Sequence, residues 1–147
     1  MEVRIEGAEK LAAVARQLRQ TGDKELRKQM YRGLRSAAKP MIADTREHAR
    51  RTLPKEGGLN ERVARSKFRV SVRAAGRDPA VRITATGLDK RLDTQGRIRH
   101  PVYGNRDVWV EQKVPAHWFE IPMRAGSGKV RHELVQVVDD IAKKLSH

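Results

Sequence analysis

The residues best suited to chemistry in this 147-residue chain lie between His100 and Glu120. Imidazole and carboxylate groups hold a divalent metal and activate water in metal-dependent nucleases. The residues of this stretch that carry such groups are His100, Asp107, Glu111, His117 and Glu120. Their spacing matches no recognised metal-binding pattern, and no two histidines of the chain have the i, i+4 spacing of a helical zinc motif. The acidic residues have Arg or Lys neighbours in the sequence, so their role is explained by the balance of local charge. We therefore predict no catalytic residue and no metal site here.

Other kinds of reactive site are also missing from the sequence. Phosphate loops of the GxxxxGK[ST] or GxGxxG type do not occur, and no serine lies in a nucleophile elbow. The chain contains no cysteine, which excludes disulfides, thiol chemistry and a cysteine-ligated metal. We predict a protein that is not an enzyme and that needs no cofactor.

The charge of the chain is strongly basic, with a formal net charge of +14. Residues 54–99 hold 12 Lys and Arg against 5 Asp and Glu, so the middle third is the most basic part. Such a field favours nucleic acid or an acidic protein as a partner, although a basic surface also serves solubility alone. The N-terminus lacks an apolar signal core and no apolar run approaches 18 residues. We expect a protein made in a cytoplasm, with no membrane span.

Hydrophobic periodicity predicts one α+β domain over residues 1–147, with helices at about 8–20, 23–52 and 128–146 and a central antiparallel sheet at about 66–120. Gly22 is placed to end the first helix and Asp23 to cap the second. Pro40 predicts a kink or break near Lys39. Residues 124–129 read as a flexible joint, with Ser127 as the cap of the last helix.

Two runs of alternating residues around residues 75–79 predict a β-hairpin in the middle of the chain. One face is apolar and is expected to meet the helices, and a short edge strand is expected at residues 3–5. The other face is basic and carries Lys67, Arg69, Arg73 and Arg82. Like charges side by side across strands cost stability, so this face predicts an anionic partner, with a solvated outer face as the alternative.

Residues 100–120 hold four of the six aromatic residues of the chain. We expect this stretch to form the largest contact surface, on which the helices and the hairpin pack. The residues expected in this packing or assembly segment are His100, Pro101, Tyr103, Gly104, Trp109, Trp118 and Phe119. The polar stretch before it, residues 87–99, has no clear period and predicts a mobile loop, or a hairpin arm around residues 94–96. That loop would expose Lys90, Arg91 and Arg97.

Three motifs follow one another in a distinctive order: LPKEGGL at Leu53–Leu59, RHPVYGN at Arg99–Asn105 and VPAHWFEIPM at Val114–Met123. Long helical segments precede and follow them. This order resembles the tail-completion, or neck, proteins of long-tailed bacteriophages, over nearly the whole chain.

The resemblance implies an α+β fold and a structural virion protein without enzymatic activity or cofactor. The expected role is that of a subunit that forms a ring, expected to be a hexamer. This ring lies at the head–tail junction and joins the DNA-filled capsid to the tail. The subunit's expected partners are further copies of itself, neighbouring connector and tail-tube proteins, and phage DNA in non-specific contact. The alternative is a non-enzymatic nucleic-acid-binding module that uses the basic hairpin.

Overall fold

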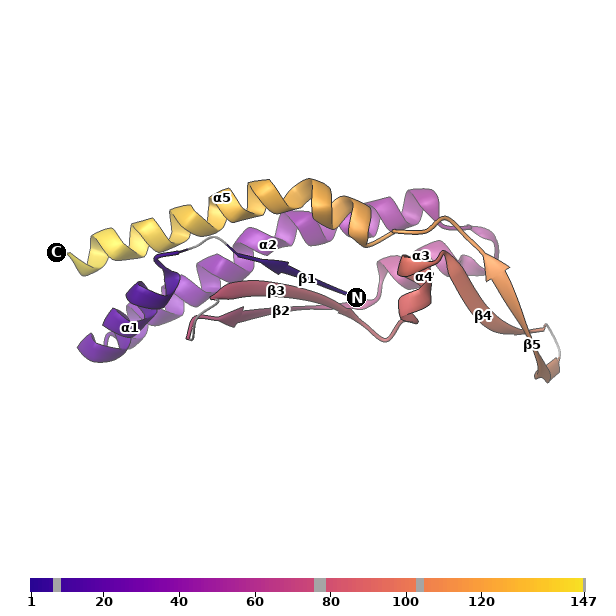
Figure 1. Cartoon of the computed structure of the whole chain (residues 1–147), viewed down its shortest axis with the longest axis horizontal. Coiled ribbons are helices and arrows are strands. Elements are labelled where there is room, and N and C mark those ends of the chain that lie inside the picture. The colour runs from indigo at the N-terminus through magenta and orange to yellow at the C-terminus, as the bar shows by residue number, and fades with distance from the viewer. Residues whose placement is uncertain (7–8, 76–78, 103–104, 147) are drawn as a thin grey trace.

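The computed structural model is a long, narrow α+β fold in which two long helices lie side by side along a small sheet (Figure 1). The structure describes residues 1–6, 9–75, 79–102 and 105–146. The elements, in chain order, are β1 (Glu2–Ile5), α1 (Leu11–Thr21), α2 (Lys24–Thr52), the 3-10 turn η1 (Glu56–Gly58), α3 (Leu59–Ala64), β2 (Lys67–Arg73), β3 (Ala80–Thr86), α4 (Lys90–Thr94), β4 (Arg97–Val102), β5 (Asn105–Lys113) and α5 (Glu120–Leu145).

Helix α2 begins where the sequence predicts and continues past its proline. Gly22 adopts a left-handed φ of 69° after α1, and the Asp23 carboxylate accepts a hydrogen bond from the backbone N–H of Leu26 at 3.0 Å. Of the kink or break expected near Lys39, the break is not found, because α2 is one helix with Pro40 inside it. Pro40 costs one backbone hydrogen bond, but Ala38 and Met41 beside it are buried in the core. Burial of this face offsets the local cost and keeps the helix continuous.

Helix α5 begins at Glu120 and not near residue 128, so the flexible joint expected over residues 124–129 is wrong. Pro122 lies in the first turn, where a helix tolerates proline, and the Ser127 hydroxyl donates to the Arg124 carbonyl at 3.0 Å instead of capping a helix. Gly126 lets the backbone of α5 approach α2 closely. A Cβ atom at this position would lie 2.9 Å from Cγ of Met41.

The first sheet is three-stranded and antiparallel, in the order β1-β3-β2. The expected edge strand is therefore present as β1, and β2 and β3 form the expected hairpin pairing. Residues 76–78 of the expected turn lie outside the described residues. Val81 and Ile83 of the central strand are fully buried and face the helices with the other apolar positions of the sheet.

The second sheet consists of β4 and β5 alone, so the single sheet expected over residues 66–120 is divided in two. These two strands form a hairpin that projects from one end of the molecule, away from α1 (Figure 1). We call it the arm. Every residue of β5 is exposed. The expectation that the helices and the first hairpin pack on this part of the aromatic segment is therefore wrong for β5.

Residues 90–94 form helix α4 and β4 begins at Arg97, so neither the expected loop over residues 87–99 nor the alternative hairpin around residues 94–96 is found. The helix is anchored because Leu92 is buried in the core and is only 1% exposed. Periodicity could not reveal so short a helix, since one buried apolar side chain gives no repeat. None of the helices in the described ranges is long and apolar enough to span a bilayer.

Candidate interaction surfaces

The outer face of the three-stranded sheet carries the basic residues that the sequence places there. Lys67, Arg69 and Arg73 are exposed on β2, and Arg82 is exposed on β3. The register does not set these cations directly opposite one another across β2 and β3. Arg69 pairs with Thr84, and Arg82 pairs with Ser71. The expected repulsion between these two strands is thus weaker than the sequence suggests.

Strand β1 adds both signs of charge to this face. Arg82 lies opposite Arg4 of β1, and its guanidinium forms an ion pair with the Glu2 carboxylate. Lys67, Arg69 and Arg73 form no ion pair among the residues that the structure describes. The net positive part of the face therefore lies along the edge strand β2.

The arm exposes apolar side chains on both of its faces. Val108, Trp109 and Val110 are 46%, 50% and 40% exposed. The cross-strand partner of Trp109 is Pro101, and the Arg99 guanidinium lies 5.5 Å from the centre of the indole ring.

Other residues of the expected assembly segment also belong to the arm. His100 pairs across the strands with Val110, and its Nδ1 lies 3.0 Å from the carbonyl oxygen of Pro101. Tyr103 and Gly104 lie outside the described residues. The structure thus assigns His100, Pro101 and Trp109 to an uncovered arm instead of the core.

Trp118 and Phe119 have the opposite environment, being 0% and 2% exposed in the core. The Phe68 ring of β2 stacks on Phe119, with centroids 6.2 Å apart, and meets Trp118 edge-on at 6.4 Å. The Arg46 guanidinium covers Phe68 at 4.6 Å from the ring centre. The aromatic segment is therefore split into an exposed part on the arm and a buried part before α5.

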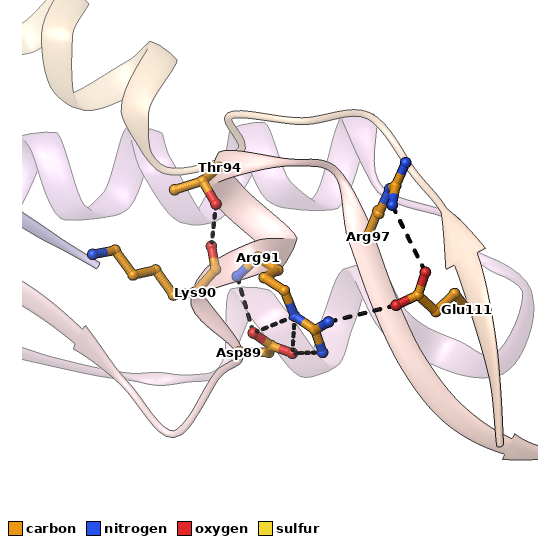
Figure 2. Close-up of polar contacts among 6 residues, drawn as sticks. All are labelled: Asp89, Lys90, Arg91, Thr94, Arg97 and Glu111. Atoms are coloured by element: carbon orange, nitrogen blue, oxygen red, sulfur yellow. Dashed lines mark hydrogen bonds and ion pairs between the residues drawn. The ribbon is translucent and has the colours of Figure 1, made fainter.

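Charged residues connect α4 to the root of the arm, as Figure 2 shows. The Asp89 carboxylate accepts a hydrogen bond from the Arg91 backbone N–H at 2.9 Å and caps α4. Arg91 donates to Glu111 of β5 at 3.5 Å, and Arg97 lies 3.8 Å from the same carboxylate. Hydrogen bonds from the Arg91 side chain and backbone lower the pKa of Asp89, so this cap remains charged until the pH falls below that lowered pKa. Lys90 is exposed at the start of α4.

One buried polar residue of this region, Asp93, was not singled out by any pattern in the sequence. It is only 6% exposed, and its carboxylate accepts the backbone N–H groups of Phe119 at 2.8 Å and Glu120 at 3.2 Å. Its carbonyl oxygen accepts the N–H of His117 at 2.7 Å. Asp93 therefore satisfies backbone donors at the start of α5 from a helix distant in the sequence.

Three of the groups considered for chemistry, those of Glu111, His117 and Glu120, have local partners. His117 Nδ1 lies 2.8 Å from a carboxylate oxygen of Glu120, while Glu111 binds the arginines at the arm root. Within the described part of the chain, no group of three or more His, Cys, Asp or Glu side chains could hold a metal ion.

Comparison of the chain with protein-family models, with curated proteins and with solved structures finds no match.

Proposed function

We propose that the protein is a structural virion protein, a ring-forming subunit at the head–tail junction that joins the DNA-filled capsid to the tail. The observation that carries this proposal is the arm, whose apolar side chains a single copy leaves uncovered. The order of the three sequence motifs supplies the place in the virion, through the resemblance to phage neck proteins. Assembly then depends on complementary surfaces, with no catalytic step and no cofactor.

The arm has the properties of an interface that is completed by another molecule. An isolated two-stranded hairpin is at best marginally stable in water, and exposed groups of large apolar side chains are typical of contact sites. Complete burial of Val108, Trp109 and Val110, each about half exposed, would contribute roughly 1 kcal/mol per residue. A gain of this size, repeated at every subunit of a ring, favours closed assembly.

A second copy of the chain offers a surface that suits the arm. A groove of about 560 Å³ lies between α2 and α5, and part of its lining is apolar, with Ala37, Pro40 and Val137. An arm that enters the groove of the next copy makes a head-to-tail contact between two different surfaces. Contacts of this kind generate rings when the rotation between subunits closes.

Trp109→Asp is expected to abolish self-association, because burial of a carboxylate in an apolar contact costs more than the contact supplies. Size-exclusion chromatography with light scattering measures the mass of the assembly. Gln20→Asp is the matched control, since it adds the same charge at an exposed position of α1, away from the arm, and should leave the ring intact. A wild-type chain that stays monomeric at the highest attainable concentration would contradict the proposal.

The basic sheet face is expected to meet an acidic surface of the neighbouring connector or tail-tube protein. The double variant Arg69→Glu, Arg73→Glu should stay folded and form rings, because both side chains are exposed and lie on the sheet and not on the arm. In a complementation assay, heads and tails should then fail to join. Normal joining with altered DNA ejection would instead assign this face to a DNA channel, and no change in either step would leave it as a solvated surface.

A further inference from the structure

Helix α2 carries a second basic surface, which neither the sheet face nor the arm includes. Its six cations are exposed and line one groove of about 840 Å³ together with Tyr31 and Ser36. We call this surface the α2 stripe: Lys24, Arg27, Lys28, Arg32, Arg35 and Lys39.

The stripe is continuous along the helix and faces away from the core. Its residues recur every three or four positions, so they follow one flank of α2 over about 22 Å at 1.5 Å per residue. The buried residues Met30, Leu34 and Ala38 occupy a different side of the helix. The stripe thus presents a nearly linear row of positive charge.

Among the described residues, the cations of the stripe have no acidic partner in direct contact. No acidic residue lines the groove, and none of the six cations forms an ion pair within the described ranges. The Arg27 guanidinium lies 5.7 Å from the centre of the Tyr31 ring, which is a contact that leaves its charge intact. Like charges three or four residues apart destabilise a helix, so the stripe costs stability in the free protein.

We propose that the α2 stripe binds the phosphate backbone of double-stranded DNA without reading its sequence. Phosphate contacts are made by Lys and Arg, need no apolar centre and gain their free energy from counterion release. Three of the six cations are lysines, and the groove offers Tyr31 as its large apolar side chain. The core of a protein–protein interface has the opposite composition, because lysine is depleted there and apolar groups predominate. The stripe therefore suits a nucleic acid better than an acidic protein.

This inference goes beyond ring assembly and does not depend on it, since the stripe and the arm are different surfaces. DNA contact through α2 also differs from binding through the basic hairpin. The stripe and the sheet face can be separated by substitution because each carries exposed arginines: Arg32 and Arg35 on the stripe, Arg69 and Arg73 on the sheet.

The test measures the affinity for a fluorescently labelled duplex of random sequence as a function of NaCl concentration. If all six cations contact phosphates, the slope of log K against log salt should be about −5. The variant Arg32→Gln, Arg35→Gln should make this slope less negative by about 2 and weaken binding roughly 30-fold at 150 mM salt. Its thermal melting should not fall, because both side chains are exposed.

The matched control is Arg69→Gln, Arg73→Gln, which removes the same charge from the sheet face and should leave the slope nearly unchanged. An equal loss in this control would overturn the inference, because DNA would then respond to net charge or to the hairpin. Absence of DNA binding by the unmodified chain would overturn it too. Tighter binding of poly-L-aspartate than of DNA, lost in the α2 variant, would assign the stripe to an acidic protein. Light scattering on the same samples reports ring formation separately, so failure here is distinguishable from failure of the proposed function.

Discussion

Replacement of Leu134 by aspartate is expected to abolish cooperative folding. Leu134 is 1% exposed on α5, in the face that packs against α2 and the sheet. An unpaired carboxylate buried there costs several kcal/mol, a large part of the roughly 5–15 kcal/mol that stabilises a domain. Circular dichroism melting should show either no cooperative transition or a greatly lowered Tm.

Two further variants make this result interpretable. Gln136→Asp introduces the same charge at an exposed position of the same helix and should melt like the unmodified chain. Leu134→Ala removes volume without adding charge and should cost about 3 kcal/mol, which lowers Tm by roughly 10 °C in a domain of this size. An unchanged Tm for Leu134→Asp would mean that α5 does not pack on the core in the isolated chain.

Replacement of Asp93 by alanine is expected to have the second largest effect. The carboxylate accepts two backbone N–H groups at the start of α5, and the N–H of Phe119 is buried. Its removal leaves these donors without a partner, at a cost of about 2–4 kcal/mol. Because Asp93 also connects α4 to α5, the arm root should loosen as well. Urea denaturation measures the loss in the free energy of unfolding.

Asp93→Asn separates the hydrogen bonds from the charge. The asparagine keeps an oxygen that can accept from the same N–H groups, so it should retain most of the lost stability. The remaining deficit, about 1 kcal/mol, reflects the favourable interaction of a negative charge with the N-terminus of a helix. Equal stability of the alanine variant and the unmodified chain would show that water replaces the carboxylate without cost.

The sequence alone determined the elements that depend on local physics. Gly22 and Asp23 fix the boundary between α1 and α2, because a left-handed residue and a side-chain cap act within a few residues. The alternation of β2 likewise identified its exposed cations, since a strand turns successive side chains to opposite faces. The α+β class followed from these periods.

The surfaces proposed for assembly and DNA were less visible in the sequence. The positions of Lys24 and Lys39 on one flank of α2 could have been read from helical spacing, but the continuity of that flank depends on α2 passing through Pro40. Trp109 and Trp118 are the same residue type in the same aromatic segment, so the sequence does not distinguish a buried from an exposed tryptophan. Their environments are opposite, 50% and 0% exposed, because Trp109 lies on the uncovered arm whereas Trp118 packs against Phe68 and Phe119 before α5.

Only the tertiary structure decided the remaining features. Local propensity predicts a kink or break near Lys39 and a flexible joint over residues 124–129. Both stretches instead lie in continuous helices, because α2 and α5 pack closely against each other. Asp93 accepts hydrogen bonds from backbone N–H groups more than twenty residues away in the sequence. The arm is exposed because neither the helices nor the first sheet covers β5. Such contacts join residues distant in the chain, and their free energy outweighs the local preferences from which a sequence is read.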